Sequence, residues 1–204
     1  MELSKATLIL RGYTLSQTQT LARLLAEQGR QVKTMEIALN TPNALEIIKS
    51  IHDEYKDRLM VGAGTVQNFA ELKSAIAAGA QFVLSPRMMS RQMLDYCKEH
   101  HVLSVPGAYT PSEIGQMFDE GADYVKVFPA NEHSIGYARK VCEPMGDMKL
   151  MAVGGVTREN VKRHFDGGYA LIGTAGGIFR KEDIIAGDEE ALSLALSQFE
   201  QEIV

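Results

Sequence analysis

The chain has 204 residues, of which 45% are hydrophobic and 23% are charged. This length and balance predict a globular protein with a packed core and exclude a disordered, collagen-like or disulfide-stapled chain. A count of 26 acidic against 21 basic residues gives a net charge of −5. A general nucleic-acid or anionic-membrane binder would need a basic surplus on one face, so we expect neither partner.

Short apolar runs alternate with longer amphipathic segments along the chain. Most of the runs are almost continuously apolar, as expected for strands that are buried on both faces of a parallel sheet. The predicted strands cover residues 7–10, 33–39, 59–62, 82–85, 103–106, 124–128, 149–153 and 170–173.

The segments between these runs predict helices, because several begin at a capping residue or a proline and end at a glycine. The predicted helices cover residues 14–28, 43–52, 68–78, 90–100, 137–142, 158–165 and 189–203, and another opens at 110–113.

A weak repeat accompanies this alternation. Gly29, Gly79, Gly121 and Gly168 each precede an apolar strand, and each interval holds two strand–helix units. We therefore predict a single α/β domain over residues 1–204, a (β/α)8 TIM barrel. The alternative is an open doubly wound sheet, which usually has fewer strands and a G-x-G-x-x-G turn after the first one. No such turn follows the first predicted strand.

The ends, the cysteines and the histidines bear on location and cofactors. The apolar run at residues 6–10 is too short for a signal peptide, and no window approaches a membrane span. Cys97 and Cys142 have no Cys-x-x-Cys spacing and indicate ordinary thiols, so we expect a cytoplasmic protein. The histidines show no metal-ligand spacing, and we expect neither a metal nor another cofactor.

Two charged residues fall inside apolar strands. Lys126 lies between valines, and burial would lower the pKa of its amine and make it a nucleophile for a carbonyl carbon. Glu36 lies in another apolar strand, where it needs a partner such as a lysine across the barrel and can move protons to and from a carbonyl substrate. The non-functional alternatives are that Lys126 reaches solvent at a strand end and that Glu36 forms a structural ion pair with no catalytic role.

Glycine clusters follow three of the strands. Those at 154–155 and 176–177 follow the seventh and eighth strands, where barrels of this kind usually bind phosphate through backbone N–H groups. The third cluster, at 62–64, precedes Thr65 and is suited to a carboxylate. Arg11 ends the first strand and can pair with the same carboxylate. A tight turn would explain any one cluster, but two adjacent clusters in these loops favour a phosphate. A solvated strand cap would explain Arg11 equally well.

Taken together, these segments resemble the class I 2-keto-3-deoxy-6-phosphogluconate / 4-hydroxy-2-oxoglutarate aldolase family. The resemblance runs from about residue 8 to residue 179. It rests on Glu36-Ile-Ala-Leu-Asn40, Val61-Gly-Ala-Gly-Thr-Val66, Gly79-Ala-Gln-Phe-Val-Leu-Ser-Pro86, Val105-Pro-Gly107, Val125-Lys-Val-Phe-Pro-Ala130 and Ala152-Val-Gly-Gly-Val-Thr157. Within the family, the motifs are more similar to the 2-dehydro-3-deoxy-6-phosphogalactonate enzymes than to the gluconate enzymes.

The resemblance implies a role for each matching position. It makes Lys126 the Schiff-base lysine and Glu36 the general acid/base. It assigns the substrate carboxylate to Thr65, the Gly64 backbone and Arg11, because Asn40 stands where the gluconate enzymes carry an arginine. The remaining implied positions are Gly154, Gly155, Gly176 and Gly177 for a phosphate and Pro86 and Phe128 in the pocket.

Two departures from the family pattern concern the phosphate. Family members commonly carry a serine where Gly176 aligns, and the segment 130–136 differs from the galactonate pattern and adds an acidic residue.

The resemblance implies a metal-independent aldolase that releases pyruvate and an aldehyde from a 2-keto-3-deoxy acid through an imine on Lys126. It also implies a homotrimer. Two alternatives remain open at this point: a phosphosugar isomerase or epimerase that uses Glu36 as a base, and a binding paralogue without turnover.

Overall fold

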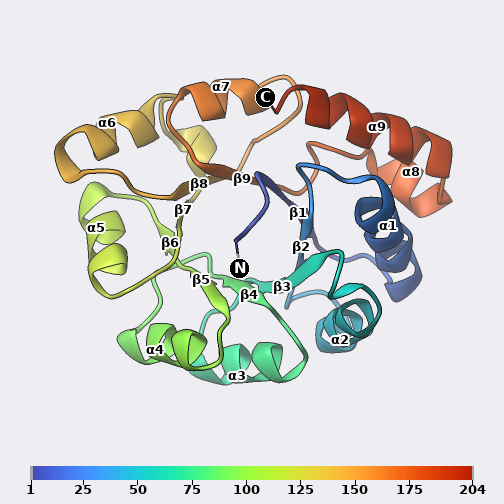
Figure 1. Cartoon of the computed structure of the whole chain (residues 1–204), viewed down its shortest axis with the longest axis horizontal. Coiled ribbons are helices and arrows are strands. Elements are labelled where there is room, and N and C mark those ends of the chain that lie inside the picture. Colours follow the sequence, from blue (N-terminus) through green and yellow to red (C-terminus); the bar gives the residue numbers. More distant parts are fainter. Residues whose placement is uncertain (1, 204) are drawn as a thin grey trace.

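The computed structural model describes residues 2–203 and places the strands in the middle of a ring of helices (Figure 1). All neighbouring strands are parallel and hydrogen-bonded in the order β5-β4-β3-β2-β1-β9-β8-β7-β6. The strands are β1 Ala6–Leu10, β2 Thr34–Ala38, β3 Met60–Gly64, β4 Phe82–Leu84, β5 Leu103–Val105, β6 Gly107–Ala108, β7 Val125–Val127, β8 Leu150–Val153 and β9 Leu171–Thr174.

The two ends of this row meet at a proline. β5 and β6 are separated only by Pro106, which has no backbone N–H to donate to a ladder. β5 pairs with β4 and β6 pairs with β7, and the Lys126 N–H donates to the Pro106 carbonyl at 2.9 Å. One bent strand therefore closes the ring, which confirms the predicted (β/α)8 fold. The sequence prediction ended this strand at residue 106, two residues too early.

Helices follow the strands around the barrel. They are α1 Leu15–Gln28, α2 Ala44–Tyr55, α3 Phe69–Ala77, α4 Arg91–Glu99, α5 Pro111–Asp119, α6 Tyr137–Met145, α7 Val161–Asp166, α8 Lys181–Ala186 and α9 Glu189–Gln201, with a 3-10 turn, η1, at Ala130–Glu132. Capping boxes at Thr14 and Thr110 start α1 and α5. α8 was not predicted, because it has six residues and buries only Ile184.

The helix predicted from residue 158 begins only at Val161. The Asn160 side chain accepts a hydrogen bond from the Thr157 N–H and donates one to the Gly155 carbonyl, both at 2.8 Å. These bonds hold residues 154–160 as a loop rather than as a first helical turn.

The core has two parts because side chains alternate along each strand. Outward residues such as Met35 and Ile37 pack against the helices. The inward set forms a separate cluster inside the barrel: Leu3, Ile9, Phe82, Leu84, Val105, Tyr124, Met151, Val153 and Leu171. Glu36 lies between Met35 and Ile37, and Lys126 lies two residues after inward-facing Tyr124. Both charged side chains therefore face the barrel interior.

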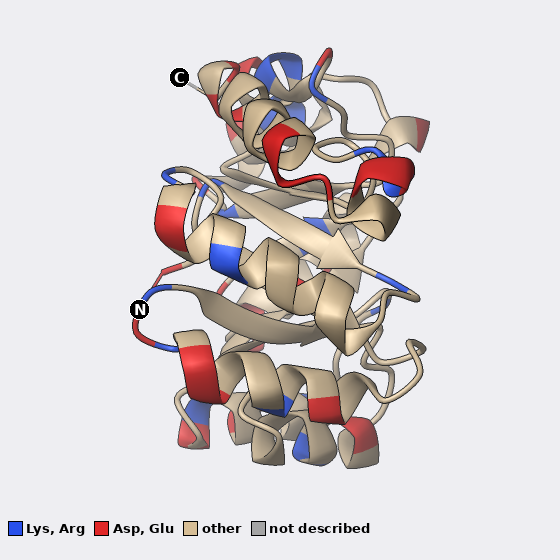
Figure 2. Cartoon of the chain, turned by 90° about the vertical axis from the view of Figure 1, so that its right-hand side faces the viewer, with Lys and Arg blue, Asp and Glu red and all other residues tan. Residues whose placement is uncertain are grey.

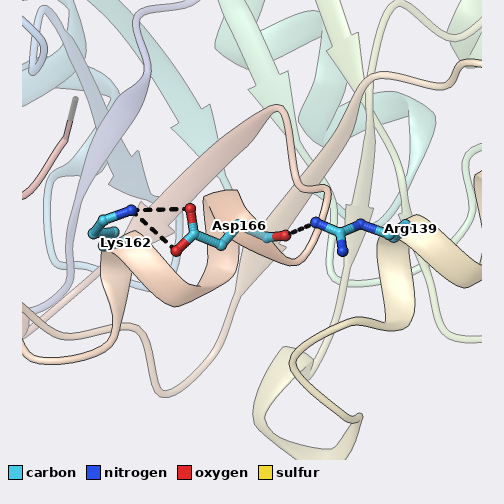
Figure 3. Close-up of polar contacts among 3 residues, drawn as sticks. All are labelled: Arg139, Lys162 and Asp166. Atoms are coloured by element: carbon cyan, nitrogen blue, oxygen red, sulfur yellow. Dashed lines mark hydrogen bonds and ion pairs between the residues drawn. The ribbon is translucent and has the colours of Figure 1, made fainter.

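Two of the outer helices are tied together by Asp166 (Figure 3). Arg139 on α6 donates to the Asp166 carbonyl at the end of α7, and the Asp166 carboxylate accepts from Lys162 at 3.0 Å. The Arg139 backbone N–H also donates to the Gly167 carbonyl at 3.0 Å. These bonds fix the start of α6, and with it the end of the loop that leaves β7.

Charges are spread over the helices. On the side shown in Figure 2, acidic and basic segments are mixed along the helical layer. Within residues 2–203 no helix is both long enough and apolar enough to cross a bilayer.

The strand that carries Glu36 is anchored at its start by Glu200 on α9. One oxygen of this carboxylate accepts the backbone N–H groups of Arg30, Gln31 and Val32 at 2.7 to 2.9 Å. We expect Glu200→Ala to lower the free energy of unfolding by about 2 kcal/mol, because these donors lose a charged acceptor. Urea denaturation measures the change. Glu202→Ala, on the exposed neighbour, is the control and should change stability by less than about 0.5 kcal/mol.

Candidate active site

The carboxyl ends of the strands open at one end of the barrel, as the strand arrow in Figure 2 shows by pointing toward the right-hand side. The loops after each strand surround this mouth, which is where barrels of this fold carry their chemistry. Lys126 and Glu36 are the buried charged side chains whose strands lead to it.

Glu36 lies against a glycine on the neighbouring strand. β2 and β3 pair in parallel so that Ala38 is opposite Gly64, and a Cβ added at Gly64 would overlap the Glu36 Oε1 atom. Glu36 is only 2% exposed, and its Oε2 atom accepts no hydrogen bond from residues 2–203. An unpaired buried carboxylate oxygen is costly, and a hydrogen bond from a substrate or a water molecule would relieve that cost.

Burial raises the pKa of Glu36 from 4.5 to about 7, while the positive charges of Lys126 and Arg11 oppose the shift. The carboxyl group is therefore present in both its protonated and its ionised form near neutral pH. A group in this state can give and take protons in the same reaction cycle.

Lys126 faces the same interior from β7. Its ammonium nitrogen lies 4.5 Å from the centre of the Phe128 ring, and the residue is 6% exposed. Burial lowers the pKa of Lys126, Glu36 raises it and Arg11 lowers it further. Within the described chain the two side chains form no ion pair shorter than 4.0 Å. They interact through space, whereas the sequence suggested direct partners.

Arg11 and Thr65 meet on another side of the mouth. The Arg11 Nη2 atom donates to Thr65 Oγ1 at 3.5 Å. Thr65 has φ of 59°, a left-handed conformation that is unfavourable for a β-branched residue and that occurs at functional sites. The Gly12 N–H donates to Thr41 Oγ1 at 2.9 Å and ties the loop after β1 to the loop after β2.

The other predicted pocket residues occupy different positions. Phe128 contacts Lys126 as described. Pro86 packs closely against Gly107, because a Cβ on Gly107 would lie only 2.7 Å from the Pro86 carbonyl carbon. Asn40 lies beside Thr65 in a groove of about 410 Å³ between the loops after β2 and β3, lined also by Leu39 and Leu45. Asn40 has no hydrogen bond to Arg11, Glu36 or Lys126 in residues 2–203.

The predicted phosphate residues form two adjacent loops, residues 154–156 and 174–177, which we call the glycine loops. Thr174 joins them, because its hydroxyl donates to the Val156 carbonyl at 2.6 Å and accepts from the Gly177 N–H at 3.0 Å. Over residues 2–203, the N–H groups of Gly154, Gly155 and Gly176 make no hydrogen bond and are available to a ligand oxygen.

The glycine loops have a neighbour that the sequence did not single out. The Asn131 side chain, in the loop after β7, packs against both glycines. Its Oδ1 atom lies 3.0 Å from the position that a Cβ on Gly154 would take, and its Cβ atom lies 2.8 Å from that position on Gly155. Both glycines have positive φ, 111° and 67°. The departure of segment 130–136 from the family pattern was the only sequence signal for Asn131, because its contact depends on how two loops fold together.

Metal ligands were not expected from the sequence. No group of three or more His, Cys, Asp and Glu side chains in residues 2–203 is placed to hold a metal ion.

A parallel barrel with a buried lysine and a buried carboxyl group at its mouth is the architecture of an enzyme that acts on carbonyl compounds. A model of the KDPG and KHG aldolase family matches residues 3–193. KDPG is 2-keto-3-deoxy-6-phosphogluconate, and KHG is 4-hydroxy-2-oxoglutarate. The chain belongs to this family, which confirms the resemblance found in its motifs.

Curated relatives match most of the chain. The 2-dehydro-3-deoxy-6-phosphogalactonate aldolase of Escherichia coli (strain K12) is 31% identical over 174 residues, 84% of this chain and 83% of that protein. The 2-dehydro-3-deoxy-phosphogluconate aldolase of Treponema pallidum (strain Nichols) is 31% identical over 185 residues, 90% of this chain and 86% of that protein.

Solved structures share the fold. A structure described as native KDPGal has a TM-score of 0.86 and 24% identity and covers 100% of this chain and 98% of its own. The KDPG aldolase of Legionella pneumophila, with pyruvate captured as a covalent carbinolamine, has a TM-score of 0.82 and 24% identity and covers 96% of this chain and 92% of its own.

The raised pKa of Glu36 has a consequence for stability. The folded state holds the proton more tightly than the unfolded state, so stability falls as the pH rises from 4.5 to about 7. Glu36→Gln removes this dependence. We expect the stability of the variant relative to the parent protein to rise by roughly 3 kcal/mol between pH 5 and pH 8.

Urea denaturation at several pH values measures this difference. Glu99→Gln, on the exposed end of α4, is the matched control and should show no such rise. A difference that stays constant with pH would mean that Glu36 is ionised throughout the range.

Proposed function

We propose that the chain is a class I aldolase that cleaves a 2-keto-3-deoxy acid into pyruvate and an aldehyde through an imine on Lys126. The observation that carries this proposal is the joint burial of Lys126 and Glu36 at the mouth of the barrel, with the pKa of each moved toward neutrality. Membership of the KDPG and KHG aldolase family supports it, as does the covalent pyruvate adduct described for the Legionella pneumophila enzyme.

The first stage is imine formation. The neutral amine of Lys126 attacks the C2 ketone of the substrate, and the carbinolamine loses water. Its oxygen leaves after taking a proton from Glu36, which exchanges protons readily because its pKa is about 7. Arg11 and Thr65 hold the substrate carboxylate, the guanidinium through charge and the hydroxyl through a hydrogen bond.

The second stage breaks the carbon–carbon bond. Ionised Glu36 takes the proton of the C4 hydroxyl group, the C3–C4 bond breaks, and its electron pair moves into the protonated imine to leave an enamine. The C4 fragment departs as an aldehyde. Protonation of the enamine carbon and hydrolysis of the imine release pyruvate and restore Lys126. The iminium group is the electron sink, so the proposed reaction needs no metal and no organic cofactor.

The end of the substrate opposite its carboxylate, here called the far end, binds at the glycine loops in this proposal. The N–H groups of Gly154, Gly155 and Gly176, free of hydrogen bonds within residues 2–203, supply donors for an oxygen-rich group. Phosphate is the group that the names of the relatives indicate. Family membership also leads us to propose a homotrimer that works in the cytoplasm in carbohydrate breakdown. Light scattering of the purified protein tests the trimer.

Chemical trapping tests the imine. We expect incubation with pyruvate and borohydride to add a reduced pyruvyl group to Lys126, visible by peptide mass spectrometry, and Lys126→Met to abolish both the adduct and pyruvate release. Lys149→Met, at the opposite end of the barrel, should keep both. Active enzyme without an adduct, but with proton exchange on a phosphosugar, would favour an isomerase.

The contact between Gly64 and Glu36 yields a second test. We expect Gly64→Ala to lower kcat by about a hundredfold, because the added methyl group displaces the carboxyl group from the reacting atoms. Trapping of pyruvate on Lys126 should persist at a reduced rate, because Glu36 also assists the loss of water that forms the imine. Gly115→Ala is the control, since its methyl group would meet only the mobile end of Met145 at 2.9 Å. Unchanged kcat in Gly64→Ala would exclude Glu36 as the proton carrier.

A further inference from the structure

The loop after β7 adds a group to the far-end site that the proposed function does not yet use. This loop, residues 129–135, runs past the glycine loops, and the Asn131 side chain lies on Gly154 and Gly155. The orientation of its amide group decides what chemistry the site presents to a ligand.

Glu132 sets that orientation. The Asn131 Nδ2 atom donates to Glu132 Oε1 at 3.1 Å. An ionised carboxylate can only accept hydrogen bonds, so the NH2 group of Asn131 must face Glu132. The amide oxygen then faces the other way, and it lies 3.0 Å from where a Cβ on Gly154 would be. Asn131 therefore presents an acceptor to the glycine loops, and the exposed Glu132 carboxylate lies on the other side of its amide group.

The arginines beside the glycine loops do not compensate for that charge. Arg158 is bonded to Gln198 and faces Glu159 at 3.9 Å, and Arg180 faces Glu182 at 3.7 Å. Arg11 ends the strand next to β9, but its guanidinium group donates toward Thr65, on the side away from the glycine loops. The nearby arginines are thus directed away from the glycine loops, whereas only the Asn131 amide group separates the Glu132 carboxylate from them.

Asn131 is also held in place. The His133 ring is stacked between Tyr109 and Tyr137, with centroid separations of 4.1 Å and 3.9 Å. The Tyr137 hydroxyl donates to the Tyr109 carbonyl at 2.8 Å. The C-terminal end of the loop continues into α6, which Arg139 fixes to α7 (Figure 3). These contacts hold the part of the loop that follows Asn131 and so fix its path beside the glycine loops.

A site of this kind offers N–H donors on one side and a carbonyl acceptor on the other. A sugar hydroxyl group satisfies both, because it accepts from a glycine N–H and donates to the Asn131 Oδ1 atom. A phosphate monoester is largely dianionic at neutral pH and has no proton to donate. Its oxygens would face the Asn131 oxygen and the Glu132 charge, which is unfavourable.

We propose that the Asn131–Glu132 pair makes the far-end site select a neutral, hydroxyl-terminated tail over a phosphate dianion. The preferred substrate is then an unphosphorylated 2-keto-3-deoxy sugar acid, cleaved into pyruvate and an unphosphorylated hydroxyaldehyde. This inference rests on the proposed aldolase reaction and reverses the preference for phosphate that the glycine loops and the relatives indicate.

Pyruvate release from matched substrates tests the inference. The full-length enzyme is assayed with 2-keto-3-deoxygluconate, 2-keto-3-deoxygalactonate and the 6-phosphate of each. We expect kcat/KM for the preferred unphosphorylated acid to exceed that of its 6-phosphate at least tenfold. A preference for the 6-phosphate would overturn the inference but leave the aldolase reaction standing. Absence of both pyruvate release and borohydride trapping would overturn the aldolase reaction as well.

Variants separate this selectivity from general effects on catalysis. Glu132→Gln removes the charge and lets the Asn131 amide turn its NH2 group toward the glycine loops. We expect the ratio of kcat/KM for the 6-phosphate to that for the free acid to rise roughly tenfold. Asn131→Asp adds a charge and should lower the ratio further. Glu143→Gln, an exposed change on α6 near Lys149 at the opposite end of the barrel, is the control and should leave the ratio unchanged. A ratio that is equal in all four proteins would contradict the assignment of Asn131 and Glu132.

Discussion

The removal of two charged groups from water is the constraint on which the candidate site depends. Glu36 and Lys126 lie in an interior that apolar side chains otherwise fill, and neither has an ion-pair partner within residues 2–203 to replace its hydration. Desolvation destabilises the charged form of each, so the pKa of the carboxyl group rises and that of the amine falls. A direct ion pair would have fixed both charges. Because the two groups interact only through space, neither charge is fixed by a direct partner, and the pKa of each moves toward neutrality.

The barrel supplies this environment through its geometry. A missing Cβ at Gly64 leaves room for the Glu36 carboxyl group on the adjacent strand, and Gly62 gives the Phe82 ring the same room one layer below. The bent strand at Pro106 closes the ring next to β7 and so encloses Lys126. Apolar packing below the site and open loops above it confine the chemistry to one end of the barrel.

The loops around the mouth divide the site by charge. Arg11, Thr65 and the two buried ionisable groups are suited to a keto acid head. The glycine loops and Asn131 supply neutral donors and an acceptor at the far end. The same framework can therefore accept different tails through changes in a single loop. In that case substrate choice within the family depends on residues outside the motifs that define it.

The sequence by itself determined the architecture, the family and the identity of the two buried ionisable residues. A charged residue inside a continuous apolar strand must lie in the barrel interior or reach solvent at a strand end. The pattern of apolar residues was therefore sufficient to single out Lys126 and Glu36. Tertiary structure decided how these residues are used. The separation of Lys126 from Glu36, the position of the Glu36 carboxyl group over Gly64 and the contact of Asn131 with Gly154 all join segments that are distant in the chain. Such contacts depend on strand register and loop path, and local sequence carries no direct record of either.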